Sequence, residues 1–255
     1  MIVRNCENAS PVASLPSDQS LRFRLGLGFL AVMLLGGRLP AADSPNTTPA
    51  GTPVALTPLI LKLPSPAEKG TPKDIPLGSN VEPLSTNARP PMLVPAGLTN
   101  LAPGATVTCS DRNAGPDMLA KLADGEKEPA DQNIVSLRKG LQWVQLDFGS
   151  PKDLFAVVIW HAYKADLIYH DVIVRVADDP DFMQNVRTLF NNDQANTAGL
   201  GAGADREYFE SNEGKLINTK GARARCIRFY SKGSTDGALN EYTEIEVYGR
   251  AALSP

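Results

Sequence analysis

The stretch that decides the fold is WVQLDFGSPKDLFAVVIW, which occupies residues 143–160. Over residues 143–149, valine, leucine and phenylalanine alternate with glutamine and aspartate. A period of two is typical of a β-strand that buries one face. Residues 155–160 are apolar without interruption, which is typical of a central strand covered on both faces. The turn residues Gly149-Ser150-Pro151 separate the two strands that we predict here.

The period of two recurs towards the C-terminus. It is present in residues 172–176, 227–229 and 245–248. Clusters of Asp, Gly, Pro and Ser separate these runs, and no segment carries a long apolar stripe of period 3.6. Residues 116–123 are expected to form one or two helical turns. Several short strands with turns between them predict an all-β antiparallel sandwich or jelly roll.

The distribution of proline divides the chain. Of its 255 residues, 21 are proline, and 14 of these lie between Pro40 and Pro103. No Phe, Trp or Tyr occurs between Phe29 and Trp143. A stretch rich in proline and poor in aromatic residues cannot bury enough apolar surface to offset its chain entropy. We predict a disordered, polyproline-like linker over residues 43–103, a globular domain over 104–250 and a tail over 251–255.

One apolar stretch within the predicted linker, Pro91 to Leu98, has two readings. In the simpler reading it makes only incidental contact with the domain. In the other it packs on the domain edge as a leading strap.

The N-terminal region has the three parts of a secretory signal. Arg22 and Arg24 precede an apolar run over residues 25–37, and Leu39-Pro40-Ala41-Ala42-Asp43 follows with small residues suited to cleavage. A short buried helix is the alternative, but four glycines make this run a poor helix former. We predict a signal peptide with a polar prefix over residues 1–42, and export to the periplasm, the cell envelope or the extracellular space. Since no apolar run reaches 18 residues, no stable transmembrane segment is expected after cleavage.

Composition and motifs argue against several classes of function. The formal net charge of −3 lacks the basic excess of nucleic-acid-binding proteins, so no nucleic-acid partner is expected. The sequence contains no Gly-x-Ser-x-Gly, His-Glu-x-x-His or Cys-x-x-Cys motif. The run GLGAG at residues 199–203 lacks the Gly-Lys-Ser/Thr ending of a phosphate loop and indicates a flexible surface loop. We therefore predict no catalytic residues and no enzyme.

Three stretches between residues 122 and 249 form a recognisable set. They are Leu122-Ala123-Asp124-Gly125, then 143–149 with 157–160, and then 224–230 with 243–249. In order and spacing they resemble the discoidin, or coagulation factor V/VIII C-type, domain of the galactose-binding-like superfamily. The resemblance implies an antiparallel jelly-roll β-sandwich. Many bacterial members of this family are carbohydrate-binding modules of the family 32 kind, which bind sugar through loops at one rim.

The resemblance also implies a structural calcium ion. Its ligands would be the carbonyls of Lys121 and Thr243 and the carboxylates of Asp124 and Glu244, with a further oxygen from Glu126 or Asp131. Hard oxygen ligands are those that calcium prefers. In the alternative reading, Asp124-Gly125 is a plain turn and Glu244 is a solvated strand residue. The loop after Gly125 departs from the family pattern, because Glu-Lys-Glu-Pro-Ala-Asp stands where a Thr ligand is often found.

A ligand-binding rim is implied in the same way. Family 32 modules often use a histidine, an arginine, an asparagine and an aromatic ring, and the candidates here are His161, Arg187, Asn192 and Tyr242. In the alternative reading, the histidine packs at a strand end and the asparagine belongs to an ordinary turn. Residues 160–170 contain five ring side chains, which either line a pocket mouth or partner surface, or belong in part to the core.

Two cysteines, Cys109 and Cys226, follow the predicted signal peptide. An exported protein can form a disulfide between them. Alternation argues against the bond, because Cys109 shares the phase of Val107 and is expected to point inward. Cys226 has the opposite phase to Ile227 and is expected to point outward.

The expected function is that of an exported, non-catalytic binding module whose ligand is a glycan at the cell envelope or outside the cell. The alternative is a protein–protein interaction or adhesion module of the same fold, with an envelope protein as its partner and no sugar ligand. An enzyme with an unrecognised pair of carboxylates is a third class. A concave polar rim with one exposed ring would favour sugar, and an apolar exposed loop would favour docking.

Overall fold

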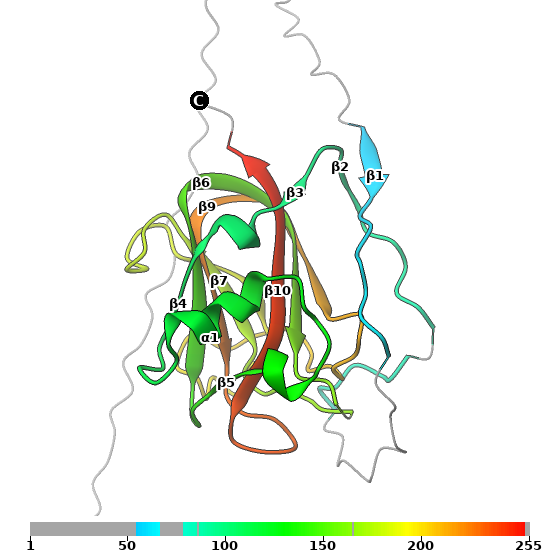
Figure 1. Ribbon diagram of the computed structural model, residues 1–255, viewed down its shortest axis with the longest axis vertical. Coiled ribbons are helices and arrows are strands. Elements are labelled where there is room, and N and C mark those ends of the chain that lie inside the picture. Colours follow the sequence, from blue (N-terminus) through cyan, green and yellow to red (C-terminus); the bar gives the residue numbers. More distant parts are fainter. Residues whose placement is uncertain (1–54, 67–78, 86, 165, 253–255) are drawn as a thin grey trace, which may run out of the picture. The chain divides into compact units, whose positions relative to one another are not determined.

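Two long strands join the two layers of the fold. In the computed structural model, which describes residues 55–66, 79–85, 87–164 and 166–252, β6 (Gln142–His161) and β9 (Lys215–Ser231) each run through both layers (Figure 1). The two strands pair antiparallel, with a shift in register between Asp147 and Lys152. Gly149 lies at this shift and has a φ of +72°, a backbone conformation that glycine adopts most easily. The bend lets each strand leave the first layer and enter the second.

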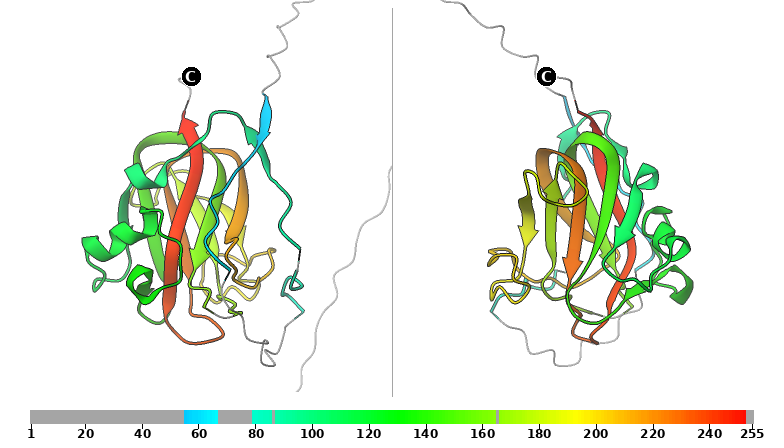
Figure 2. Two further views of the ribbon diagram at one scale, coloured as in Figure 1. Left: turned by 45° about the vertical axis from the view of Figure 1, so that its right-hand side comes forward. Right: turned by 90° about the vertical axis from the view of Figure 1, so that its left-hand side faces the viewer.

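Short strands complete both layers, which Figure 2 shows from two further sides. The first layer has the order β4–β6–β9–β7–β8, and in the second β10 pairs with β6 and also with β3 and β5. The described strands other than β6 and β9 are β1 (Leu56–Pro58), β2 (Leu93–Pro95), β3 (Thr99–Asn100), β4 (Thr106–Cys109), β5 (Val135–Leu137), β7 (Ile173–Ala177), β8 (Arg187–Asn191) and β10 (Asn240–Ala251). The described helical segments are α1 (Pro116–Ala120) and the 3₁₀ turns η1 (Ala102–Gly104), η2 (Lys121–Ala123) and η3 (Asp131–Asn133).

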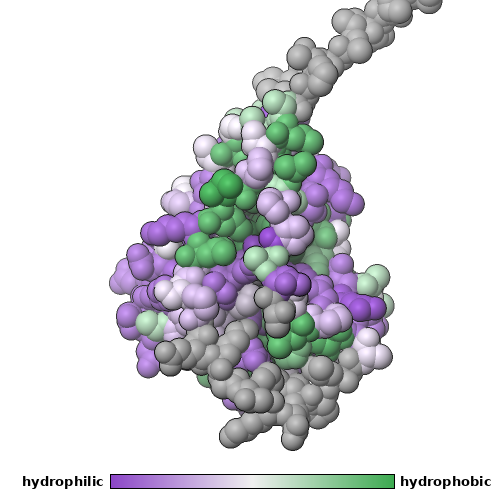
Figure 3. All heavy atoms as spheres, turned by 90° about the vertical axis from the view of Figure 1, so that its right-hand side faces the viewer, coloured by the Kyte–Doolittle hydropathy of each residue, from purple (hydrophilic) through white to green (hydrophobic). Residues whose placement is uncertain are grey.

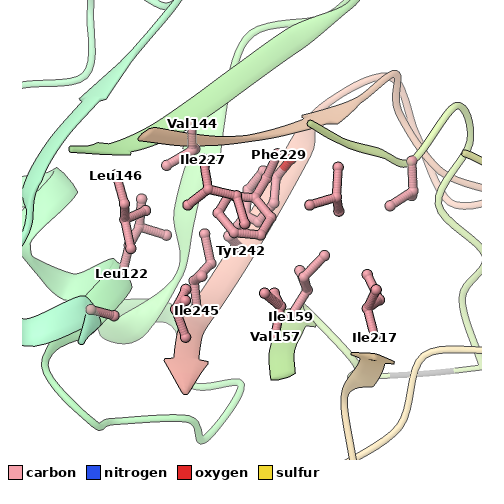
Figure 4. Close-up of a cluster of buried hydrophobic side chains, with 14 of the residues drawn as sticks. Leu122, Val144, Leu146, Val157, Ile159, Ile217, Ile227, Phe229, Tyr242 and Ile245 are labelled. Atoms are coloured by element: carbon pink, nitrogen blue, oxygen red, sulfur yellow. The ribbon is translucent and has the colours of Figure 1, made fainter. Parts of the chain in front are cut away.

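The main core lies between the two layers (Figure 4). Val144 and Leu146 point into it from the first layer, and Val157 and Ile159 point into it from the second, all with no exposed surface. Ile227, Phe229, Ile245 and Val247 join them with 0–1 % exposed surface. The strands therefore bury the residues that the period of two selected. The predicted fold class, an all-β antiparallel sandwich, is confirmed.

A segment from the predicted linker covers the outer face of the second layer. We call this segment the strap, and it comprises residues 55–66, 79–85 and 87–98. Within it β1 pairs with β2, and Val94 of β2 is 4 % exposed. Leu61 packs on a small second cluster of buried side chains, formed by Val158, Trp160 and Tyr163. The strap thus supplies the cover on the second face of residues 155–160 that their apolar sequence predicts.

The strap also presents apolar side chains to the outside. Figure 3 shows its face of the molecule, where hydrophobic residues gather. Leu56, Ile60, Leu63, Leu84 and Leu93 are 42–81 % exposed. The largest exposed apolar side chains of the described residues lie mainly on the strap.

Some expectations fall on residues that the structure does not describe. The predicted signal peptide, residues 1–42, lies outside the described residues, as do 43–54 and 67–78 of the predicted linker. Over the part of the chain that is described, no helix is long and apolar enough to cross a membrane.

Candidate functional site

A cavity of about 420 Å³ lies between the strap and the segment that leads into β9. The strap lines one side with Glu82 to Pro90, residue 86 excepted, and the other side is made by residues between Tyr208 and Leu216. We call this cavity the strap pocket. A volume of this size falls within the range of small-molecule sites in proteins.

Backbone and side-chain hydrogen bonds hold the strap at the pocket. The amide of Glu82 donates to the carbonyl of Glu207 (2.8 Å), and the amide of Glu207 donates to the carbonyl of Asn80 (3.0 Å). At the other end, the Arg89 guanidinium donates to the carbonyls of Gly214 (2.7 Å) and Glu213 (2.9 Å). Because strap and domain are bonded at both ends, the walls of the pocket keep a defined spacing.

The pocket presents hydrogen-bond donors and acceptors together. Lys215 Nζ lies 2.6 Å from Glu82 Oε1 and 4.4 Å from the centre of the Tyr208 ring. The Glu213 carboxylate accepts the backbone amide of Arg89 at 3.1 Å. The lining also includes the half-buried ring of Phe209. Charged donors and acceptors beside a ring suit a ligand that carries hydroxyl groups on an apolar frame.

Three of the four predicted rim residues are buried. His161 and Tyr242 have no exposed surface, and Asn192 is 3 % exposed. The His161 ring is stacked on Tyr169 at 4.3 Å between ring centres and lies 4.5 Å from Tyr242. Its Nδ1 lies 2.6 Å from Oε1 of Glu210, a carboxylate that is also fully buried. The structure thus brings His161 and Tyr242 together in the interior.

The other two predicted rim residues lie apart from this pair. Asn192 Oδ1 accepts the backbone amide of Val172 at 2.7 Å, which fixes the start of β7. Arg187 is exposed on β8 and lines a different cavity, described below. The expected common rim is therefore not formed by these four side chains, because only Arg187 reaches the surface. Ligand binding by any one of them stays a prediction.

The five rings of residues 160–170 divide in the same way. Trp160, Tyr163 and Tyr169 are 0–1 % exposed and belong to the two cores or their edges. The His170 side chain is 41 % exposed, and its Nδ1 lies 2.7 Å from Glu207 Oε1. Of these five rings, that of His170 reaches the surface.

Part of the expected calcium site is assembled, because the Asp124-Gly125 turn lies against Glu244. Glu244 on β10 has no exposed surface, and both of its carboxylate oxygens accept the backbone amide of Gly125 (3.2 and 3.3 Å). Burial raises the pKa of Glu244 to about 8, and the negative charges of Glu246 and Asp124 add to the rise. The reading of Glu244 as a solvated strand residue is wrong, because its side chain has no exposed surface and the loop at Gly125 bonds to its carboxylate.

The side chains of the other residues named for the calcium site have partners of their own, while ligation by the carbonyls of Lys121 and Thr243 stays a prediction. Asp124 Oδ1 accepts the amide of Glu126 at 2.9 Å, and the side chain of Lys121 donates to the carbonyl of Gln132. Thr243 is buried, and its hydroxyl donates to the carbonyl of Trp160 at 3.2 Å. Asp131 is exposed and pairs with Lys164. Among the described residues no group of three or more His, Cys, Asp or Glu side chains could hold a metal ion, so an ion here would need backbone carbonyls.

The two cysteines are free thiols. Cys109 is half-buried on β4, and Cys226 is buried on β9 beside Asp147. Burial raises the pKa of the Cys226 thiol to about 12, and the negative charge of Asp147 adds to the rise. As expected from its phase, Cys226 lies opposite Ile227 and outside the main core, and this outer position is nevertheless fully buried.

Comparison with known proteins gives matches to solved structures. No family model and no curated protein match the chain. A family 89 glycoside hydrolase from Clostridium perfringens is similar at 17 % identity and a TM-score of 0.44, over 60 % of this chain and 15 % of that one. Chitosan-binding module 1 of a chitosanase/glucanase from Paenibacillus sp. IK-5 is similar at 19 % identity and a TM-score of 0.41, over 59 % and 99 %. The CBM32 of AlyQ, in complex with 4,5-unsaturated mannuronic acid, is similar at 18 % and 0.40, over 56 % and 92 %.

Proposed function

We propose that this chain is an exported, non-catalytic carbohydrate-binding module and that the strap pocket is its sugar site. The observation that carries the proposal is the pairing of Lys215 and Glu82 beside Tyr208 and Phe209 in one cavity. Sugar hydroxyls both donate and accept hydrogen bonds, and the apolar face of a pyranose packs on a ring. The motifs that resemble the discoidin domain, and the signal-like sequence of residues 1–42, support the same assignment.

A glycan array probed with residues 43–255, in calcium and in chelator, tests the proposal. Binding to a defined class of sugar is expected. Lys215→Ala should weaken it by about tenfold or more, because a charge-assisted hydrogen bond is lost from the pocket. Arg112→Ala is the matched control, since Arg112 is an exposed cation outside the pocket lining. Equal loss in both variants, or no binding to any glycan, would reject the strap pocket as a sugar site.

The alternative function, docking of an envelope protein, is favoured by a different observation. The exposed leucines and isoleucine of the strap form the kind of apolar surface that partners cover. If the array is blank, Ile60→Asp becomes the informative variant, because Ile60 is 81 % exposed. Docking through the strap predicts that this variant abolishes capture of a partner from the native envelope while leaving the melting temperature unchanged.

We further propose that the module holds one calcium ion at Glu244 and Asp124, with carbonyl oxygens of Lys121 and Thr243. A buried carboxylate with a raised pKa is the group that a bound cation would stabilise in its charged form. When bound, calcium supplies a positive charge that ties the Asp124-Gly125 loop to β10. Lys127 also favours the charged form of Glu244, because its positive charge lowers the pKa of that carboxyl. The Nζ of Lys127 lies 2.7 Å from Oε1 of Glu246.

The dependence of stability on pH provides the test. The folded pKa of Glu244, about 8, lies above the unfolded value of about 4.3. The folded state therefore holds a proton that the unfolded state releases, and stability contributed by this group falls as pH rises from about 4.3 to about 8. In chelator, the melting temperature should fall by several degrees between pH 5 and pH 8, and Glu244→Gln should remove most of that fall. Added calcium should raise the melting temperature of the unmodified chain at pH 8 but not that of Glu244→Gln, and no calcium effect on either would overturn the proposal.

A further inference from the structure

A second cavity, of about 570 Å³, lies at the bends of β6 and β9. We call it the upper pocket. Its lining consists of Pro151, Asp178, Asn185, Val186, Arg187 and Arg223. Two of these six residues are arginines, and they come from different strands, β8 and β9. None of the residues discussed above for the sugar or calcium sites lines this cavity, apart from Arg187.

The charge of Arg187 has no acidic partner within the described residues. Its guanidinium donates to the carbonyls of Asn185 (3.4 Å) and Arg223, and none of the described carboxylates forms an ion pair with it. The one carboxylate of the lining, Asp178, accepts the side-chain amide of Asn185 at 2.7 Å. The hydrogen bond to Arg223 holds Arg187 beside β9 and leaves other guanidinium donors for a ligand.

The loop that forms one wall, residues 178–186, is held rigidly. The Asp179 carboxylate accepts the backbone amides of Asp181 (3.0 Å), Met183 (3.0 Å) and Gln184 (2.6 Å). Phe182 and Asn185 have φ of +58° and +50°, a conformation that costs energy in residues other than glycine. A wall that keeps two strained residues in place needs strong tertiary support.

That support comes from a stacked arginine on the outer face of the first layer. The Arg228 guanidinium carbon lies 4.0 Å from the centre of the Phe182 ring and 4.2 Å from the Trp143 ring. Arg228 also donates to the carbonyl of Pro180 at 3.2 Å and to Gln145 Oε1 at 2.6 Å. The loop is thus clamped to the sheet, and the upper pocket is shaped before any ligand arrives, which reduces the entropy lost on binding.

We propose that the upper pocket binds the anionic group, carboxylate or sulfate, of an acidic saccharide, with Arg187 as the residue that contacts it. Guanidinium groups bind the oxygens of carboxylates and of tetrahedral oxyanions through paired, charge-assisted hydrogen bonds. The site is distinct from the strap pocket, because the two cavities share no lining residue and Arg223 lies eight residues along β9 from Lys215. A chain with both sites could hold two parts of one glycan, or two glycans at once.

Calorimetric titration of the full chain with three tetrasaccharides tests the proposal. Oligogalacturonate carries carboxylates, κ-carrageenan tetramer carries sulfates, and methyl-esterified oligogalacturonate carries neither. At least one acidic tetramer should bind at least about tenfold more tightly than the ester, with an affinity that falls as sodium chloride is raised. Which tetramer binds identifies the anionic group. Equal affinity for acid and ester forms, or no binding of either acidic tetramer at millimolar concentration, would overturn the proposal.

Variants test whether the acidic tetramer binds in the upper pocket. Arg187→Ala should weaken the affinity for the acidic tetramer by about tenfold. Arg187→Lys should weaken it less, because lysine keeps the charge but not the paired donors. Arg112→Ala should leave the affinity unchanged. Lys215→Ala is scored on the neutral glycan that the array identifies, whereas Arg187→Ala is scored on the difference in affinity between the acidic and the esterified tetramers, so failure of the strap pocket and failure of the upper pocket give different results. An acidic tetramer whose affinity is insensitive to Arg187→Ala would place its site elsewhere.

Discussion

Replacement of Glu210 by alanine is expected to lower the free energy of unfolding by about 3 kcal/mol. Glu210 and His161 are both fully buried and lie 2.6 Å apart, and His161 Nε2 has no hydrogen-bond partner among the described residues. Removing the carboxylate leaves the imidazole between Tyr169 and Tyr242 without its Nδ1 partner. An unpartnered polar group in the interior loses its hydration and gains nothing in return.

A matched pair on the surface provides the control. His170 and Glu207 make the same contact at 2.7 Å, but their side chains are 41 % and 23 % exposed. Water replaces the lost partner at such a site, so Glu207→Ala should change stability by about 1 kcal/mol or less. Urea unfolding of both variants at pH 7 measures the difference. Similar losses in the two variants would show that burial does not govern the His161–Glu210 pair.

The position of His161 illustrates how far strand periodicity predicts a site. Val157, Ile159 and His161 occupy alternate positions of β6, so they share the face that packs into the main core. The alternation of buried and outward residues predicts the fold correctly. The same alternation continues to the end of the strand, so it also buries His161 and keeps it out of the expected rim. The partner of His161, Glu210, lies 49 residues away in an irregular segment, and no local pattern in the sequence connects the two.

The strap is larger than the sequence analysis allowed, because only Pro91 to Leu98 had a packed alternative, whereas residues 55–66 and 79–85 also contact the domain. Its composition is that of a linker, because it is rich in proline and contains no aromatic residue. It nevertheless orders where Leu61 meets Val158, Trp160 and Tyr163, since the domain supplies the apolar surface that the strap itself lacks. The apolar run of residues 155–160 was the available signal, because a strand that is apolar on both faces needs a cover on both.

The strap pocket and the expected calcium site are both completed by segments that lie far away in the sequence. Lys215 and Glu82 of the strap pocket are 133 residues apart, and Arg89 is 124 residues from Glu213. Glu244 alternates with Ile245, so periodicity places it on the outer face of the second layer. There it is buried because Lys62, Lys127 and Glu246 form a bonded layer beside it. Sequence patterns predicted which faces are apolar, but not which distant segment covers them.

Replacement of Gly214 by alanine is expected to destabilise the chain by about 3 kcal/mol and to loosen the strap. Gly214 has a φ of +61°, and a Cβ built there would lie 2.7 Å from Cε2 and 2.8 Å from Nε1 of Trp160. Trp160 cannot move away easily, because it has no exposed surface and its Nε1 donates to the carbonyl of Asn212 at 2.9 Å. The carbonyl of Gly214 also accepts the Arg89 guanidinium, so a shift of this backbone would disturb an anchor of the strap.

Gly199→Ala separates the steric effect from the backbone effect. Gly199 has a φ of +71°, but a Cβ there would meet nothing within 4 Å. It should therefore show only the penalty of a left-handed residue, about 1 kcal/mol. Equal losses of stability in the two variants would contradict the clash with Trp160.

In the Trp160→Phe background the smaller ring should relieve the contact, so Gly214→Ala should then lose less stability than it does beside tryptophan. Protease cleavage within the strap should rise in Gly214→Ala and not in Gly199→Ala, because only the former disturbs the carbonyl that Arg89 binds.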